Sequence, residues 1–361
     1  MKVAVIGAGV HGACSARALA LAGHEVHVYE QFEVGHSRGS SHGTSRIIRR
    51  AYADLYYAEL MGEVFPLWEE FEQQLGKQVL HRCGLLIFGQ STDPWFRNAR
   101  ASLISTSTPF EAMGPIDVAR RFGGFHLEPD EEALFEEGAG FLKAERVIRG
   151  ALAVAMENGA KVLEGVRAQP TDDGVIEGTK YDALVVCAGA WIRQFVPLPT
   201  QVRLQHFAYF TVEEGLPPMA WVEANDDHFY GFPDYGRGAK IGLHRYGPEV
   251  NPSDGPFKPN PDVIREIGEV ARFRLGVSPA PRESFTCLYT VLPGEEFAVG
   301  ALPMKVPAFF ASACSGHGFK FGIWIGRLMR DLVEGNTSLE AHSRFAPPAG
   351  VLQGGEEEQR A

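Results

Sequence analysis

The chain has 361 residues, 45% of them hydrophobic, and this length favours two domains over a single core. The formal net charge is -11, no run of Lys and Arg could neutralise a phosphate backbone, and no apolar stretch reaches the roughly 20 residues of a membrane span, so neither nucleic acid nor a membrane is expected as a partner. The N-terminal residues are apolar for only a few positions before glycines interrupt them, so a soluble, unprocessed protein is expected. The five cysteines are scattered without a C-x-x-C pair, which indicates neither a disulfide framework nor a metal site and favours a reducing cytoplasm.

The first elements in chain order predict a β-α-β unit. Residues 2–6 and 25–30 have the β-branched, apolar pattern of strands, and residues 13–22 are good helix formers that end at Gly23. The next strand-like runs lie between turn-rich stretches such as 215–218 and 248–261, and they occupy residues 84–89, 202–212, 229–232 and 240–243. These runs predict a mostly antiparallel sheet.

The alternation of helix and strand returns in the middle and at the end of the chain. It is predicted from a helix at 144–158, strands at 161–163 and 183–187, and a helix at 317–334. The expected fold class is therefore α/β plus α+β, with a discontinuous Rossmann-like nucleotide-binding domain and a mostly antiparallel substrate domain. We assign residues 1–83, 142–196 and 288–345 to the first and 84–141 and 197–287 to the second. The polar, glycine-rich tail 346–361 is expected to be disordered.

The clearest motif is a glycine fingerprint between the first strand and the first helix. Gly7, Gly9 and Gly12 would let the backbone approach a pyrophosphate at the helix N-terminus, and Glu30 lies where an acid binds the adenosine ribose. The alternative is a glycine-rich turn with a surface glutamate. The fingerprint does not separate NAD from FAD, but the small residues around Gly189, after a buried strand, favour FAD.

Residues 39–52, GSSHGTSRIIRRAY, resemble a motif of the monomeric sarcosine oxidase and N-methyltryptophan oxidase family, within the D-amino-acid oxidase-like superfamily. Three more segments agree in order: YGFP at 230–233 with KIGLH at 240–244, CLYT at 287–290, and SGHGFKF at 315–321. With the fingerprint, the likeness extends from Met1 to about Phe345.

The resemblance implies a two-domain monomer with covalently bound FAD that oxidises an N-alkyl amino acid to an imine and is reoxidised by dioxygen to give hydrogen peroxide. It assigns Cys287 to the flavin linkage, Arg49 and Lys320 to the substrate carboxylate, and Lys240 to oxygen activation. Residues matched around the flavin ring and substrate are His42, Arg46, Tyr230, His244 and Tyr289. Those matched to cofactor binding also include Ser40, Ser41, Arg46, Gly316, His317, Gly318 and Lys320.

Each of these residues also has an ordinary structural interpretation. Arg46, Arg49 and Arg50 could be a solvated basic face, Cys287 a small buried hydrophobe, and Lys240 a strand-edge lysine. The remaining cysteines, Cys14, Cys83, Cys187 and Cys314, match no functional position and are interpreted as packing residues. His42 and His244 could transfer protons, although a structural role is the commoner one.

A cationic site would favour the neutral amine that hydride loss requires, and we expect Arg49, Lys320, Lys240 and His244 to supply that bias. Two positions depart from the sarcosine oxidase pattern: Thr44 replaces an Asp, and Trp221 replaces a Met near the substrate, which leaves the size of the substrate side chain open. Trp221, with Tyr230 and Tyr289, could line an aromatic pocket or fill the core.

The leading hypothesis is an oxidase of sarcosine or a similar small N-alkyl or cyclic secondary amino acid. Alternatives with the same fold act on N-methyltryptophan, pipecolate or a glycated amino acid, or pass electrons to an acceptor other than dioxygen. A flavin-binding protein without turnover is a further alternative, but it would need neither a carboxylate clamp nor an oxygen-site lysine.

Overall fold

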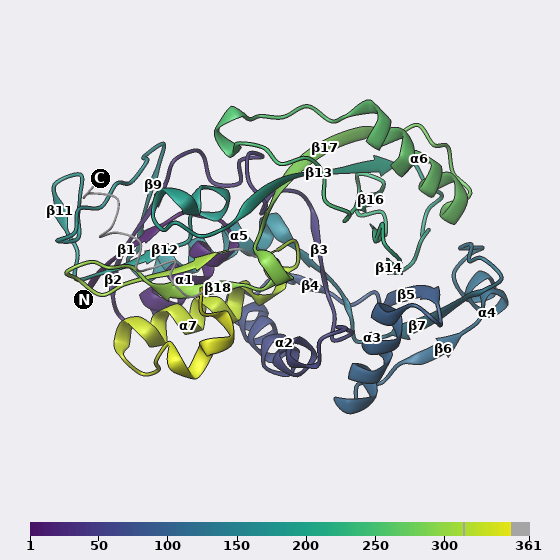
Figure 1. Cartoon of the computed structure of the whole chain (residues 1–361), viewed down its shortest axis with the longest axis horizontal. Coiled ribbons are helices and arrows are strands. Elements are labelled where there is room, and N and C mark those ends of the chain that lie inside the picture. The colour runs from purple at the N-terminus through teal and green to yellow at the C-terminus, as the bar shows by residue number, and fades with distance from the viewer. Residues whose placement is uncertain (313–314, 348–361) are drawn as a thin grey trace, which may run out of the picture.

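A computed structural model describes residues 1–312 and 315–347, and it places two large sheets at opposite ends of the molecule (Figure 1). The first sheet has six strands, parallel except for its edge strand β18. In spatial order they are β18 (Ala298–Ala301), β19 (Ala308–Ser312), β12 (Ala183–Val186), β1 (Lys2–Ile6), β2 (Glu25–Glu30) and β9 (Lys161–Glu164). The central strands are almost wholly buried, as expected for parallel strands covered on both faces.

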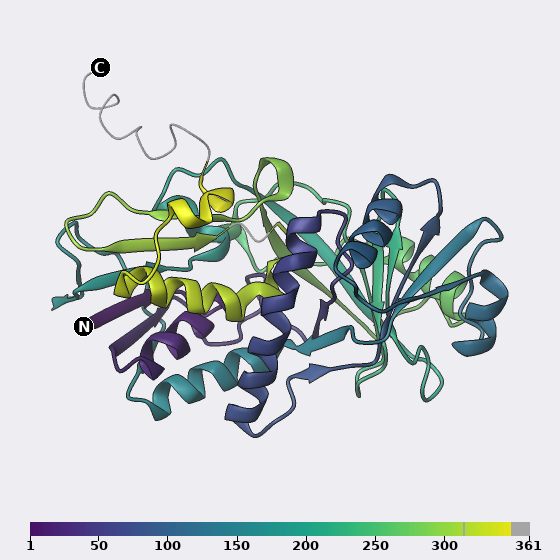
Figure 2. The ribbon, with the colours of Figure 1, turned by 90° about the horizontal axis from the view of Figure 1, so that it is seen from below.

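Four helices form a layer on one side of this sheet (Figure 2). They are α1 (Val10–Leu21), α2 (Leu55–Leu75), α5 (Ala144–Glu157) and α7 (Gly322–Glu334), and apolar residues of all four share one core with β1 and β2. The packing of α1 on α7 is close because Gly326 has no side chain, and a Cβ there would lie 2.5 Å from the Cys14 backbone. None of the helices in the described ranges is long and apolar enough to cross a membrane.

The second sheet has eight strands and is antiparallel except for the β14–β5 pair. In spatial order they are β17 (Glu283–Val291), β13 (Gln201–Phe210), β16 (Ala239–Leu243), β15 (Phe229–Phe232), β14 (Ala220–Ala224), β5 (Leu85–Gln90), β7 (Glu131–Glu136) and β6 (Glu111–Met113). Apolar residues of α4 (Pro115–Arg121) and α6 (Pro261–Leu275) pack on one face, and those of α3 (Pro94–Ser105) pack on the other.

The described residues also form two smaller sheets. One contains β3 (Ser45–Ile48), β8 (Gly140–Lys143) and β4 (Leu80–His81), and the other is the hairpin of β10 (Val175–Ile176) and β11 (Thr179–Lys180). The position of β3 matters for the site, because this strand carries Arg46 and leads directly to Arg49.

The predicted fold class is confirmed, including the mostly antiparallel second sheet. The helix predicted at 317–334 is divided: a 3-10 turn, η4 (Gly318–Phe321), contains Lys320 and precedes α7. Helices α2, α3, α4 and α6 were not predicted. Cys314 lies outside the described residues. The tail predicted to be disordered also lies outside them, except for residues 346 and 347.

Candidate functional site

The turn between β1 and α1 requires glycine at two positions. Gly7 has φ of 99°, and a Cβ on it would lie 2.4 Å from the carbonyl oxygen of Cys187 in the loop after β12. A Cβ on Gly12 would lie 1.8 Å from the carbonyl oxygen of Gly7. The helix therefore starts close against the strand, and its N-terminal end remains open to an anionic group.

Glu30, at the end of β2, faces the same turn. Its carboxylate accepts hydrogen bonds from the backbone N–H groups of Ala8 (2.9 Å) and Phe32 (3.0 Å) and lies 3.5 Å from His36 Nε2. Burial opposes ionisation, but the hydrogen bonds from His36, Ala8 and Phe32 outweigh it and lower the pKa of Glu30. A fixed, ionised acid at this point suits ribose hydroxyls.

A long cleft extends from Glu30 over the glycine turn. Many of the predicted cofactor-binding residues line it: Gly7, Gly9, Glu30, Ser40, Ser41, Arg46, Gly189, Gly316 and Gly318. Gly12 does not line the cleft, and the absence of its side chain permits the close turn. These features fit a dinucleotide whose pyrophosphate would lie at the α1 N-terminus and whose ribose would lie near Glu30.

The segment before β3 forms the inner wall of the cleft. The guanidinium of Arg46 donates to the carbonyl oxygens of Ser45, Ser40 and His42, at 2.8, 2.5 and 2.6 Å. The hydroxyl of Ser41 accepts a hydrogen bond of 3.2 Å from the backbone N–H of Val10 in α1. Arg46 thus holds the loop together and also places a positive charge in the cleft.

A second cavity adjoins the cleft and shares Arg46, Tyr289, Gly316 and Phe319 with it. The other predicted site residues that line this cavity are Arg49, Tyr230, Lys240, His244, Cys287, His317 and Lys320. His42 lines the cleft but not this cavity. The structure therefore brings together residues from five separate parts of the sequence.

Arg49 and Lys320 meet at Tyr52. The guanidinium of Arg49 lies 5.2 Å from the Tyr52 ring centre and 5.0 Å from that of Trp95, while Lys320 Nζ donates to the Tyr52 hydroxyl at 2.7 Å and to the His317 carbonyl at 2.8 Å. Arg49 Nε is buried without a hydrogen-bond partner among the described residues. Two cations, one with an unused donor, form a suitable clamp for a carboxylate.

A buried carboxylate fixes the backbone that follows Arg49. Glu136, 1% exposed, accepts hydrogen bonds from the N–H groups of Arg50 (2.9 Å) and Ala51 (3.2 Å). Burial lowers the pKa of Arg49, partly opposed by Tyr52 and Glu136. Arg50 points elsewhere, with its guanidinium 4.2 Å from the Phe65 ring centre, consistent with an ordinary structural residue.

Lys240, on β16, lines the second cavity and is only 2% exposed. Its Nζ lies 3.3 Å from the Ser45 carbonyl oxygen and 4.4 Å from the ring centre of Phe207. Burial, followed by the charge of Arg46, lowers its pKa well below the usual value for lysine. The interpretation as an ordinary strand-edge lysine is wrong, because β16 is a central strand and the side chain is enclosed.

The histidines of the site are neutral at physiological pH. Burial, followed by Arg46 and Lys240, lowers the pKa of His42 to about 3, and burial, followed by His228 and Arg49, lowers that of His244 to about 3. His244 therefore supplies no positive charge, and the expected electrostatic bias comes from the lysines and arginines. Its Nδ1 lies 3.2 Å from the hydroxyl of Tyr289, whose pKa burial raises.

Cys287 lies on β17 opposite Gln205 of β13, is 6% exposed and lines the second cavity. Cys14 and Cys187 are buried in the first core and line no part of the second cavity, and Cys83 is half-buried.

The site also contains residues that the motifs did not predict. Tyr52, Trp95 and His228 were not singled out, although Tyr52 is part of the quoted motif. Trp221 is fully buried on the opposite face of its strand, against Phe88 and Phe125, and fills the core. Its neighbour Val222 lines the cavity instead, because successive strand residues face opposite sides.

The arrangement of these residues agrees with the comparisons with known proteins. The family model described as FAD dependent oxidoreductase matches residues 2–332. The chain belongs to this family. Among its FAD-dependent relatives, monomeric sarcosine oxidase of Streptomyces avermitilis is 29% identical, with 96% of each chain covered. N-methyl-L-tryptophan oxidase of Escherichia coli is 28% identical, with 92% of this chain and 95% of that protein covered.

The solved structure of NikD, an unusual amino acid oxidase essential for nikkomycin biosynthesis, has the same fold. It superposes with a TM-score of 0.83 at 24% identity and covers 96% of this chain and 97% of its own. The predicted resemblance to sarcosine and N-methyltryptophan oxidases is confirmed, and the chain is an FAD-dependent oxidoreductase.

Proposed function

We propose that this FAD-dependent oxidoreductase oxidises sarcosine or a similar small N-alkyl or cyclic secondary amino acid. FAD would accept a hydride from the carbon next to nitrogen and pass the two electrons to dioxygen, which takes up two protons to give hydrogen peroxide. The resulting imine would react with water to give an aldehyde and an amine. The names of the relatives support this substrate class.

One observation carries the proposal: two cations, Arg49 and Lys320, converge on Tyr52 beside the cofactor cleft. A carboxylate bound there would accept from Arg49 Nε, whose donor is otherwise unused among the described residues. The same two charges disfavour an ammonium group nearby and so favour the neutral amine, which alone can lose hydride readily.

The proposed cofactor contacts follow from the cleft. The glycine turn would hold the pyrophosphate, Glu30 the adenosine ribose, and Cys287 would form a thioether to the flavin ring. Lys240 would stabilise the negative charge that develops on dioxygen as it is reduced. We further propose that the enzyme works as a monomer in the cytoplasm, as its resemblance and its scattered cysteines suggested.

The decisive experiment is a peroxide-coupled screen of secondary amino acids with the purified holoenzyme. Sarcosine or a close homologue should give peroxide and an aldehyde in equal amounts. Flavin reduction by these substrates under nitrogen, without peroxide in air, would favour a dehydrogenase instead. Activity confined to N-methyltryptophan, pipecolate or glycated amino acids would overturn the choice of substrate.

The covalent linkage is tested separately by acid precipitation. A thioether keeps the flavin with the precipitated polypeptide, whereas Cys287→Ser should release it into the supernatant. Flavin released from the mature wild-type protein would remove Cys287 from its proposed role.

A further inference from the structure

The outer wall of the second cavity consists of residues outside the quoted motifs. Trp95 lies in the first turn of α3, and His228 directly precedes β15. Their ring centres are 5.6 Å apart in an edge-to-face arrangement, and the Arg49 guanidinium lies 5.0 Å from the Trp95 ring centre on the inner side. The Trp95 ring therefore lies between Arg49 of the proposed carboxylate clamp and the imidazole of His228.

His228 has a backbone conformation that a histidine rarely adopts. Its φ is 49°, in the left-handed region, which costs a residue with a side chain of order 1 kcal/mol or more unless the surroundings impose it. Asn225 imposes it: its side-chain oxygen accepts from the N–H groups of Asp227 (3.1 Å) and His228 (2.8 Å). Asn225 in turn donates to Glu223 at 3.1 Å, and Glu223 is ion-paired with buried Arg274 at 2.7 Å.

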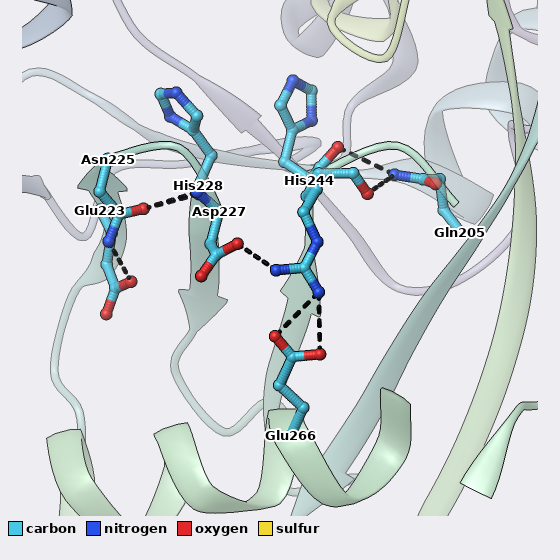
Figure 3. A network of polar contacts seen from close by, with 8 residues as sticks. Gln205, Glu223, Asn225, Asp227, His228, His244 and Glu266 are labelled. Atoms are coloured by element: carbon cyan, nitrogen blue, oxygen red, sulfur yellow. Dashed lines mark hydrogen bonds and ion pairs between the residues drawn. The ribbon is translucent and has the colours of Figure 1, made fainter. Parts of the chain in front are cut away.

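The neighbouring turn reinforces this position (Figure 3). The N–H groups of His244 and Arg245 donate to the carbonyl oxygens of His228 (3.2 Å) and Asp227 (3.0 Å), and the Arg245 side chain pairs with Asp227 and with Glu266 of α6. Gln205 donates to the carbonyl oxygens of His244 (2.9 Å) and Arg245 (3.1 Å).

The two imidazoles point the same way, away from Glu266, with ring centres 6.1 Å apart. His244 is committed to Tyr289 at 3.2 Å. His228 is half-buried, and burial, followed by the charge of Arg49, lowers its pKa, so the ring is neutral at physiological pH. A hydrogen bond with the backbone of Glu223 engages one of its two ring nitrogens, which leaves the other for a polar group of a substrate. Two turns thus hold a neutral polar ring at the edge of the cavity.

We propose that Trp95 and His228 form a subsite for the substrate's side chain, in which Trp95 packs against its apolar part and His228 hydrogen-bonds a polar group on it. The inference rests on the proposed function. It predicts that, among small secondary amino acids, the enzyme prefers those whose side chain carries a hydroxyl or amide group. Sarcosine, which has no side chain, would use the clamp but neither of these contacts.

Near-isosteric substrate pairs test this directly. N-methyl-L-asparagine and N-methyl-L-leucine share a branched shape but differ in the amide, as N-methyl-L-serine and N-methyl-L-2-aminobutyrate differ in the hydroxyl. A hydrogen bond worth about 0.5–1.5 kcal/mol predicts a preference of roughly 2- to 12-fold in kcat/KM for the polar member of each pair. Because a contact made equally before and during reaction acts on binding, the difference should lie mainly in KM.

His228→Gly should abolish this preference, since it removes the imidazole while glycine keeps the left-handed backbone without strain. His228→Asn, which also tolerates that backbone but is shorter, should give the same result and guards against a misfolded glycine variant. Asp226→Ala, an exposed position on the same turn, is the matched control and should keep the wild-type preference.

Several results would overturn the inference. Wild-type enzyme that oxidises both members of each pair equally, or His228 variants that keep the wild-type preference, would exclude the subsite while leaving the proposed function intact. Failure of every secondary amino acid to reduce the flavin would instead contradict the proposed function itself.

Discussion

Arg49 and Lys320 are brought together by Tyr52, which contacts both side chains. The two residues are 271 positions apart in the sequence, yet one guanidinium and one ammonium contact the same phenol. Motif resemblance selected both cations, because each falls in a distinctive segment. It could not reveal the Tyr52 contact or Trp95, since these depend on how the segment between β3 and α2 approaches α3 and η4 in space.

The clamp makes a direct prediction. Arg49→Met and Lys320→Met keep most of each side-chain stem but remove the charge, and a charge-assisted hydrogen bond is worth about 1.5–3 kcal/mol. Each variant should weaken binding of amino acid substrates by roughly 10- to 100-fold and that of uncharged amines far less. Arg50→Met is the matched control and should bind both as wild type does. Equal losses for acids and amines would show that the pair serves folding or flavin binding.

Lys240 supports a prediction about dioxygen alone. Reduction of dioxygen creates negative charge, which a fixed cation in a buried site stabilises, whereas the amino acid gains little from it. Lys240→Met should leave anaerobic flavin reduction nearly intact and slow reoxidation by several orders of magnitude, because about 4 kcal/mol corresponds to roughly a thousand-fold in rate. Rapid mixing of reduced enzyme with oxygen measures this step.

The pH dependence of flavin reoxidation by dioxygen provides an internal control for the proposed role of Lys240. Since burial and Arg46 lower the pKa of Lys240, the ammonium should lose its proton as pH rises, at a pH below the range of ordinary lysines. Wild-type reoxidation should therefore slow in that range, while the methionine variant should show no such transition. A wild-type rate that stays constant to pH 10.5, or equal loss of both half-reactions in the variant, would contradict the oxygen role.

Elements with a strong local signal were predicted almost to the residue. Strand β1 and the 229–232 strand match their predicted bounds because each is a short apolar run between turns. Helix α6 was not predicted, because the stretch that leads into it was interpreted as turn-rich. The sequence does contain its start signals, since Asn260 caps the helix and Pro261 begins it. Helix α2 contains Pro66, which normally argues against a helix interior. Its apolar face against α7 compensates, and only the tertiary structure provides that contact.

The close contact between β1 and α1 can be tested at Gly12. Gly12→Ala would place a Cβ 1.8 Å from the Gly7 carbonyl oxygen, so strand and helix must separate and the cofactor turn must distort. We expect a loss of about 1–3 kcal/mol in the free energy of unfolding and weaker flavin retention. Gly62→Ala is the control, because Gly62 is exposed inside α2 and a Cβ there meets nothing within 4 Å.

Gly62→Ala should stabilise the protein by about 0.5–1 kcal/mol, since alanine loses less conformational entropy in a helix. Urea unfolding of the two variants, with flavin absorbance recorded on the same samples, measures both effects. Full flavin content and unchanged stability in Gly12→Ala would show that the close approach is not needed.

At the scale of the whole molecule, the site exists because two sheets with different topologies meet. The glycine turn of the parallel sheet lines the cleft, and the antiparallel sheet with its connecting turn contributes Lys240, Tyr230 and His228 to the second cavity. Periodicity predicted both sheets, since it is a local property. It could not predict that the turns at 225–228 and 244–247 would lie side by side, because their contact depends on the order of strands β14, β15 and β16.

The free energy of unfolding of the whole protein should decrease at acidic pH, because the folded state keeps some buried histidines neutral. His206, on β13, is 4% exposed, its Nε2 has no hydrogen-bond partner among the described residues, and burial lowers its pKa. In the unfolded chain its pKa is about 6.5. Below that pH the unfolded chain binds a proton that the native state does not, so stability decreases as pH falls from 6.5 toward the folded pKa.

The variant His206→Met removes this one proton and keeps a side chain of similar volume. Between pH 6 and 5 its free energy of unfolding should fall less steeply than that of wild type, by up to about 1.4 kcal/mol per pH unit. At pH 7.5 and above, where the unfolded histidine is neutral too, the pH dependence of the two proteins should coincide. His42 and His244 act in the same sense but are present in both proteins, so they cancel in the comparison. Urea unfolding of the two holoenzymes at pH 7.5, 6 and 5 measures the difference, and parallel curves across that range would mean that His206 is protonated, or solvated, in the native state.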